Sequence, residues 1–174
     1  VIGLIGVAGA GGLLLTQGYR MERITVWLDP AASEKGHQTI QGLYAIGSGG
    51  LFGKGLGQSM QKLGFLPEAN NDMIFSVICE ELGLFGALCV LALFFALIWR
   101  FMVIAVNAPD LYGSMIVVGV IAHIGIQVFI NIAVATNTIP NTGIPLPFIS
   151  YGGSSLVFML LEMGLVLSVS RYIN

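Results

Sequence analysis

The chain has 174 residues, of which 56% are hydrophobic and only 9% are charged, and its mean hydropathy is +0.89. Soluble domains carry about 25% charged residues, so this composition argues against a soluble protein and indicates a membrane protein. The small formal net charge of −2 predicts no nucleic-acid partner. Cys79 and Cys89 lie on one apolar run, where we expect packing residues and not a disulfide.

The chain starts at Val1, inside an apolar stretch that has neither a charged leading region nor a small-residue cleavage site. This start does not resemble a signal peptide. We therefore expect the sequence to begin partway through a longer membrane protein.

Four apolar stretches are long enough to cross a membrane, which takes roughly 20 residues in a helix. Only helices and closed barrels satisfy their backbone in lipid, and these runs are too long for barrel strands. The sequence therefore predicts an all-α, polytopic membrane protein. The predicted segments are a helix over 1–19, a large loop over 20–71, a helix over 72–99, a short loop over 100–110, a helix over 111–139, a turn over 140–147, a helix over 148–170 and a tail over 171–174.

Basic residues near the ends of spans predict the orientation, because short cytoplasmic loops are enriched in Lys and Arg. Arg100 lies in the short loop and Arg171 in the tail, so both segments are predicted to face the cytoplasm. The large loop over 20–71 and the turn over 140–147 then lie outside. Five of the seven basic residues fall in the large loop, but long loops cross the membrane largely regardless of charge.

Two parts of the large loop have a recognisable pattern. In HQTIQGLYAIGSGG, Ile40, Leu43 and Tyr44 have helical spacing, which fits a short helix on the membrane rim or a buried turn on the helix ends. The following GSGGLFGKGLG matches neither phosphate-binding glycine motif. We expect its glycines to let the chain pass closely over other backbone. Lys54 within it is also a candidate contact for an anionic head group.

Acidic residues gather where the second apolar span begins. Asn70 and Asn71 are good N-cap residues for a helix starting near Asp72, whose carboxylate would then lie in a favourable first turn. Glu80 and Glu81 lie two to three turns deeper, where an acid needs a partner or a cavity. They either pair with a basic residue on another helix or line a path for a substrate or proton.

A polar stripe runs along the third span. His123, Gln127 and Asn131 are four residues apart and share one helix face, which favours hydrogen bonds between helices over a proton relay. Glu162 is a single acid in the last span and therefore a functional candidate. The sequence has no metal-ligand spacing and identifies no cofactor, and it leaves a divalent cation as an open option.

Three stretches resemble the FtsW/RodA/SpoVE family, the SEDS proteins of bacterial cell growth and division. They are NTGIPLPFISYGGSSL (141–156), GLYAIGSGGLFGKGLGQSMQKLGFLPEANNDMIFSVICEELGLFG (42–86) and GYRMERITVWLDP (18–30). The match follows the family order over most of the chain, and QKLGFLPEA is nearer the FtsW and SpoVE side. The resemblance implies about ten membrane helices, of which this chain would hold the last four.

The resemblance also implies an activity and a location. Members of this family polymerise lipid II into peptidoglycan glycan strands in the cytoplasmic membrane, together with a class B penicillin-binding protein that acts as transpeptidase. The family's essential outer-loop aspartate corresponds to Asp72, which would act as the general base. A histidine often precedes that aspartate in the family, whereas Asn70 and Asn71 stand here, so no role for a histidine carries over. A piece of four helices is expected to be inactive alone.

Further site candidates accompany Asp72. Those expected to bind substrate are Arg23, Lys54, Lys62, Glu68, Ser150 and Gly152, and the polar candidates inside the membrane are Glu80, Glu81, His123 and Glu162. The segment around Pro140, Pro145 and Pro147 cannot form a regular helix, and it would form a groove wall, a support for the partner or a plain corner. Two other functions stay open: a flippase for lipid-linked precursor that uses the membrane acids, and a non-catalytic scaffold.

Overall fold

The computed structural model describes residues 18–32, 36–59 and 71–173, so the predicted helix over 1–19 lies almost wholly outside these ranges. Within them every regular element is a helix, which agrees with the predicted fold class. In chain order the elements are α2 (Gly18–Leu28), the 3-10 helix η1 (Pro30–Ala32), α3 (His37–Gly49), α4 (Ile74–Val106), α5 (Leu111–Ala135) and α6 (Gly153–Ser170).

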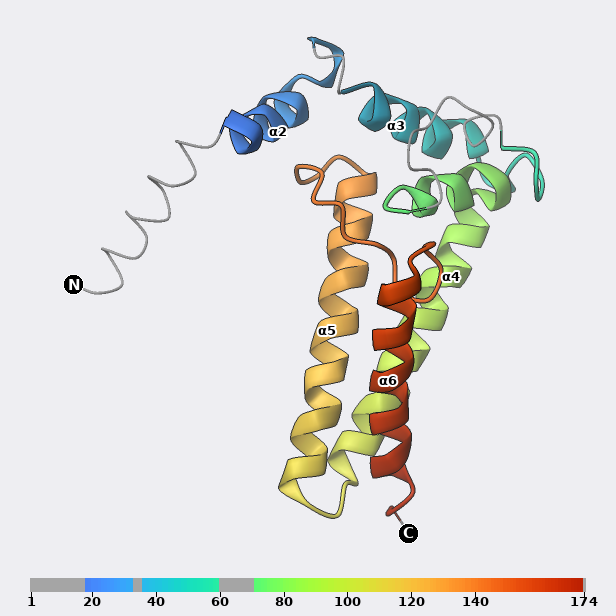
Figure 1. The fold of residues 1–174 in the computed structure, drawn as a ribbon. Coiled ribbons are helices and arrows are strands. Elements are labelled where there is room, and N and C mark those ends of the chain that lie inside the picture. The colour runs from blue at the N-terminus through green and yellow to red at the C-terminus, as the bar shows by residue number, and fades with distance from the viewer. Residues whose placement is uncertain (1–17, 33–35, 60–70, 174) are drawn as a thin grey trace.

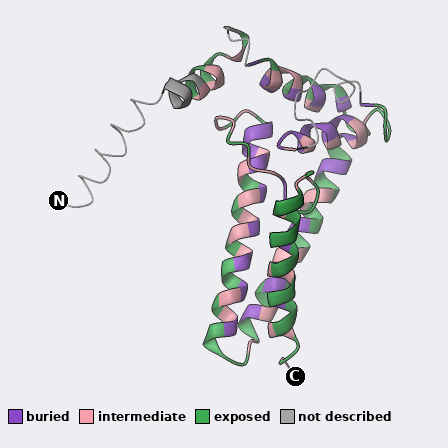
Figure 2. Cartoon of the chain, viewed as in Figure 1, coloured by how far each residue is buried: buried purple, intermediate pink, exposed green. Residues whose placement is uncertain are grey.

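Helices α4, α5 and α6 form an upright bundle in which consecutive helices run in opposite directions (Figure 1). Its core includes Val117 and Ile124 of α5, Met159 and Val166 of α6, and Phe94 of α4. All three helices are long and apolar enough to cross a membrane. Much of their outer surface is exposed, as Figure 2 shows. Many of the exposed residues are large and apolar, which suits contact with lipid or with further membrane helices.

Helices α2 and α3 lie across the end of the bundle opposite the C-terminus (Figure 1). The predicted large loop over 20–71 is therefore partly helical, and of the two alternatives for HQTIQGLYAIGSGG the structure has the helix, α3. Leu43 and Tyr44 point outward, whereas Gly42 and Gly49 are buried against the start of α4. A Cβ on Gly49 would collide with the carbonyl oxygen of Cys79, so glycine allows this close approach.

The predicted helix ends differ from the observed ones. Helix α4 continues to Val106 instead of ending at 99, because the apolar run resumes after Arg100, and the connection shrinks to residues 107–110. Arg100 is exposed, so its long side chain does not interrupt the helix. At the start of α5 the Asp110 side chain accepts a hydrogen bond from the Gly113 backbone N–H at 3.1 Å, which is an N-cap.

Helix α5 ends at Ala135, before the predicted 139, because the backbone turns into a Schellman motif. Asn137 has a φ of 54°, and the backbone N–H of Thr138 donates to the carbonyl of Ala133 at 2.8 Å. Helix α6 starts at Gly153, after the predicted 148, because the irregular segment extends through Phe148, whose φ is 62°. Both corrections lengthen the nonhelical segment between α5 and α6.

Helix α4 is broken at Gly83, whose φ is 67° and ψ is −166°. The first part, residues 74–82, turns away from the long part that follows (Figure 1). Backbone groups that lose their helical partners at the break form hydrogen bonds with the glycine-rich loop, residues 50–57. Leu84 N–H donates to Gly50 O at 2.9 Å, and Lys54 N–H donates to Glu80 O at 2.9 Å. A Cβ on Gly53 would collide with the carbonyl of Glu81, which confirms the expected close passage over backbone.

Candidate functional site

An open cleft of about 580 Å³ lies at the end of the bundle that α2 and α3 cross. Its walls come from α2, α3, the turn before α4, and the segment from Asn141 to the start of α6. Of the predicted site residues, Arg23, Asp72 and Gly152 line it. Six further polar residues line it as well: Gln38, Asn71, Asn141, Tyr151, Ser154 and Ser155. Several polar groups converging on a concave surface are typical of a ligand site.

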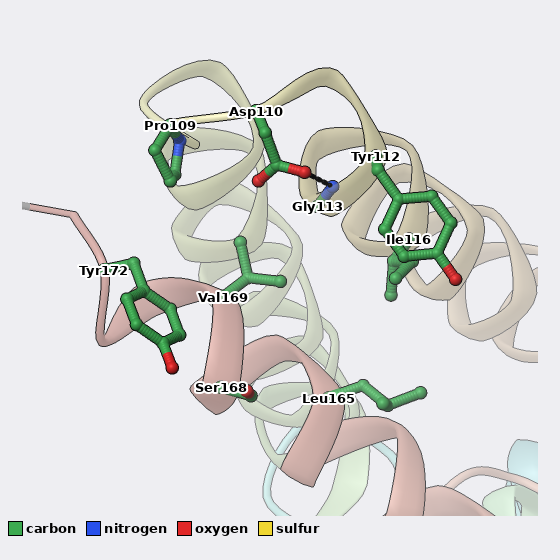
Figure 3. A pocket seen from close by; sticks show the side chains of 9 residues that line it. All are labelled: Pro109, Asp110, Tyr112, Gly113, Ile116, Leu165, Ser168, Val169 and Tyr172. Carbon is green, nitrogen blue, oxygen red and sulfur yellow. Dashed lines mark hydrogen bonds between the residues drawn. The ribbon is translucent and has the colours of Figure 1, made fainter.

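A smaller hollow of about 220 Å³ lies at the opposite end of the bundle (Figure 3). Apolar residues such as Ile116, Leu165 and Val169 line it. The carboxylate of Asp110 is directed toward the Gly113 backbone, where it caps α5, as the figure shows. The Asp110 carboxylate therefore has a structural role as a helix cap, and the larger cleft is the better candidate for the functional site.

Asp72 lies in the turn 71–73 and not in the first turn of α4, which corrects the N-cap prediction. The N-cap position is Met73, which makes no side-chain cap. The Asp72 side chain is largely buried, with 9% relative exposure, and its residual surface lines the cleft. Gln38 of α3 donates through Nε2 to Asp72 Oδ1 at 3.4 Å, which links α3 to this carboxylate.

The backbone around Asp72 is fixed by two side chains of other segments. Asn131, fully buried on α5, donates through Nδ2 to the carbonyl oxygens of Asp72 and Ile144, at 2.9 Å each. Ser150 donates through Oγ to the carbonyl of Asn71 at 2.5 Å and accepts from the Leu146 backbone N–H at 2.7 Å. Ser150, a predicted substrate contact, therefore ties the turn to the segment before α6 and is not among the lining residues.

The opposite wall is formed where α2 meets the segment between α5 and α6. Arg23 Nη1 donates to the carbonyl of Asn141 at 2.7 Å, and Trp27 Nε1 donates to the carbonyl of Asn137 at 3.0 Å. These bonds hold α2 against the nonhelical segment. They also bring the guanidinium of Arg23 to the wall of the cleft that contains Asp72.

Lys54 and Glu80, predicted for separate roles, form a salt bridge with each other. Lys54 Nζ lies 2.7 Å from Glu80 Oε1, and the Glu80 side chain is fully buried. The expectation of a basic partner is therefore met, although the partner comes from a loop and not from a helix. Lys54 is not among the residues that line the cleft.

The polar stripe makes the contacts between segments that were expected. His123 Nδ1 lies 2.7 Å from Glu162 Oε1 of α6, and Asn131 reaches the turn before α4. Gln127 and Glu81 each carry a buried side-chain oxygen without a hydrogen-bond partner in the described part of the chain. Hydrogen bonding between segments thus accounts for two of the three stripe residues.

Lys62 and Glu68 lie outside the described residues, so their predicted roles stay predictions. Within the described ranges, no three His, Cys, Asp or Glu side chains are grouped as a metal site would require. Gln38 was missed because its contact with Asp72 is tertiary and no local pattern marks it. Four other lining residues could have been identified from the sequence, because they all lie in the stretch 141–156 that resembles the family: Asn141, Tyr151, Ser154 and Ser155.

Comparison with known proteins gives consistent results. The FtsW/RodA/SpoVE family model, described as "Cell cycle protein", matches residues 1–174. Stage V sporulation protein E of Bacillus subtilis is 56% identical over 98% of this chain and 47% of its own length. A probable peptidoglycan glycosyltransferase FtsW of Geobacter sp. is 43% identical over 97% of this chain and 47% of its own length. The chain thus spans about half the length of these curated relatives.

Two solved structures share the fold. A chain of a peptidoglycan synthase complex, described as coordinating polymerization and crosslinking, has a TM-score of 0.73 and 29% identity over 99% of this chain and 49% of its own. The Rod shape determining protein RodA of Thermus thermophilus has a TM-score of 0.57 and 38% identity over 76% of this chain and 39% of its own. The chain therefore belongs to the FtsW/RodA/SpoVE family of cell cycle proteins.

Proposed function

We propose that the full protein is a peptidoglycan glycosyltransferase that polymerises lipid II during bacterial cell division or shape maintenance, with Asp72 as general base. One observation carries the proposal: the Asp72 carboxylate lies on the wall of an open cleft together with a guanidinium and several amide and hydroxyl groups. The names of the curated FtsW relatives support the activity.

The reaction needs a base, a place for sugars and compensation of pyrophosphate charge. The acceptor sugar hydroxyl attacks the anomeric carbon of the donor, and its proton passes to the Asp72 carboxylate. The bond from that carbon to the lipid pyrophosphate breaks, and its electron pair leaves with the pyrophosphate. Arg23 offsets the charge of the leaving group, since a guanidinium matches phosphate oxygens well.

The remaining polar residues of the cleft suit a carbohydrate. Gln38, Asn71 and Asn141 offer amide groups, and Ser154 and Ser155 offer hydroxyls, all of which can bind sugar hydroxyls. Gly152 has no side chain and so leaves space in the cleft at the start of α6. Because Pro145 lines the same cleft, we assign the role of a groove wall to the segment around Pro145. Substrate binding by Lys54 is less favoured because its ammonium group bonds Glu80.

We place the protein in the bacterial cytoplasmic membrane, with the cleft on the outer side and the C-terminus in the cytoplasm. The cleft is lined by α2 and α3, which cross one end of the bundle, whereas α4 and α6 both end at the other (Figure 1). Arg100 lies in the last part of α4 and Arg171 directly follows α6, as expected for positive charges inside. This placement puts Asp72 where the sugars of a lipid-linked substrate leave the bilayer.

We also propose that a class B penicillin-binding protein is the partner, since glycan strands must be crosslinked after polymerisation. The similar fold of a chain from a complex that couples polymerization to crosslinking supports this assignment. The flippase alternative loses support, because Glu80 bonds Lys54 and Glu162 bonds His123, so both acids already have a partner within the protein. The scaffold alternative does not account for a polar cleft around an acid.

The test is lipid II polymerisation by the full-length protein with its partner transpeptidase, whose own active site is inactivated. Asp72→Asn should lower the rate by about 100-fold or more, the range expected for loss of a general base. Asp110→Asn is the matched control, because it removes an acid at the other end of the bundle and Asn is an equally good N-cap. Equal glycan strand formation by wild type and Asp72→Asn would refute the assignment of Asp72.

A further inference from the structure

The carboxylate of Glu80 is the most enclosed charge among the described residues of the bundle end. Its side chain is fully buried, and both of its oxygens are bonded. Oε1 accepts from Lys54 Nζ at 2.7 Å and Oε2 accepts from Ser59 Oγ at 2.5 Å. A buried carboxylate is stable only when a cation and further donors compensate it. Lys54 and Ser59 come from the glycine-rich loop and its continuation, and Ser48 of α3 adds a longer contact to Oε1 at 3.5 Å.

The same loop supplies hydrogen-bond partners for the backbone groups at the break in α4. Carbonyls of Glu80 and Glu81 accept from the backbone N–H groups of Lys54 and Gly55, each at 2.9 Å. The N–H groups of Leu84 and Phe85 donate in turn to the carbonyls of Gly50 and Leu51. Unsatisfied backbone groups are costly near the membrane, so the break can persist only while the loop stays in place.

The break determines the direction of the segment that ends at Asp72. Residues 74–82 form a short helix with Glu80 near one end and the Asp72 turn at the other. Helix α3 packs along this segment: Gly49 contacts the backbone of Cys79, and Gln38 bonds the Asp72 side chain. A change in the angle at Gly83 would therefore move Asp72 relative to Arg23 and Asn141, which belong to other elements.

We propose that Glu80 and Lys54 are a positioning pair: their salt bridge locks the glycine-rich loop, residues 50–57, into the break of α4 and so sets the position of Asp72 in the cleft. The inference rests on the proposed function of Asp72. Neither residue touches substrate. Reactions of this kind tolerate little misplacement, since a shift of about 1 Å in a reacting group can cost about 100-fold in rate.

Lys54 and Glu80 differ in exposure, so we expect the two single variants to lose activity to different extents. Lys54 is 34% exposed, so in Glu80→Gln its ammonium can turn to water, and the glutamine still bonds Ser59. In Lys54→Met the fully buried Glu80 loses its cation, which is the more damaging change. The double variant Glu80→Gln/Lys54→Met removes the buried carboxylate together with its cation, so it should work better than Lys54→Met alone.

The experiment measures kcat and KM for lipid II polymerisation with the full-length protein and its inactivated transpeptidase, per folded molecule. We expect kcat to fall by about tenfold in Lys54→Met and less in Glu80→Gln, with KM changed less than about twofold, because geometry and not binding is altered. Lys54→Arg should restore most of the rate. Asp110→Asn, which removes an acid at the other end of the bundle and keeps the cap of α5, is the control and should stay near wild type.

A second readout follows the loop directly and does not depend on activity. Hydrogen–deuterium exchange of peptides covering residues 50–57 and 80–86 should be faster in Lys54→Met than in wild type, while α5 peptides stay unchanged. If Lys54 instead bound pyrophosphate, KM would rise, and the double variant would be no better than Lys54→Met. That result, or unchanged kcat and exchange in both single variants, would overturn the positioning pair.

Failure of this inference can be told from failure of the proposed function, because Asp72→Asn is measured in the same assay. An inactive Asp72→Asn with fully active Glu80→Gln and Lys54→Met would refute the positioning pair alone. An active Asp72→Asn would refute the assignment of the base, and the positioning role would fail with it. If Lys54→Met does not fold, Glu80→Gln and the double variant still decide the question.

Discussion

Asn131 offers a test of how the turn that carries Asp72 is held. Its fully buried amide donates to two backbone carbonyls, those of Asp72 and Ile144, which belong to segments on either side of the cleft. Leucine has the same branched arrangement of four side-chain heavy atoms, although its methyl groups are bulkier than the amide, and it has neither donor nor acceptor. Asn131→Leu therefore removes both hydrogen bonds while the branched shape of the side chain is kept.

The expected loss of stability can be worked out from these two bonds. A hydrogen bond contributes about 0.5–1.5 kcal/mol net, and bonds between membrane helices average about 0.6 kcal/mol. Two bonds and the cost of leaving buried carbonyls without this donor are partly offset by removing Asn131 Oδ1, which is buried without a hydrogen-bond partner among the described residues. The net loss in the free energy of unfolding is therefore about 1–2 kcal/mol. Because the Asp72 turn also loosens, the polymerisation rate should fall as well.

The assay is unfolding of the full-length protein in mixed micelles with a rising fraction of denaturing detergent. Gln127→Leu is the matched control: Gln127 lies one turn away on the same face, and its buried Oε1 has no hydrogen-bond partner in the described structure. It should lose less than about 0.5 kcal/mol. The reasoning is refuted if Asn131→Leu is as stable as wild type, or if both variants lose the same amount.

Two further predictions concern the break in α4 and the orientation of the bundle. Gly83→Ala should lower the free energy of unfolding by about 1–3 kcal/mol and reduce the yield of folded protein. The reasons are that Gly83 has a φ of 67° and that an added Cβ would lie 2.6 Å from the carbonyl oxygen of Leu51. An unchanged yield would argue against the observed kink. A membrane-impermeant maleimide should label Tyr44→Cys and not Asn107→Cys in intact cells, and the reverse pattern would invert the proposed topology.

The sequence predicted the helices of the bundle because uncharged apolar runs have few alternatives in a membrane. It failed at their ends, since local contacts determine where each helix stops. Helix α5 ends early because Asn137 adopts a left-handed conformation that closes a Schellman motif, and no apolar pattern encodes this choice. Helix α4 passes Arg100 because a long side chain can reach the polar layer while its helix continues.

The site was predicted in part. Asp72 and the stretch 141–156 were identified through family resemblance, and the structure brings both to one cleft. Gln38 could not be identified, because nothing in α3 marks the residue that will face Asp72. Lys54 and Glu80 were identified separately, since sequences show that a buried acid needs a partner but not which segment supplies it.

Three acids of the described bundle have a clear compensating group, whereas Glu81 keeps a buried oxygen without a hydrogen-bond partner among the described residues. Glu80 is paired with Lys54, Glu162 is bonded to His123, and Asp110 caps α5. In each case a neighbouring group offsets the cost of removing a carboxylate from water. Asp72 differs because its carboxylate borders an open cleft that also contains Arg23. An acid kept at such a place, on a turn anchored from two sides, is better explained by a task in the cleft than by the stability of the fold.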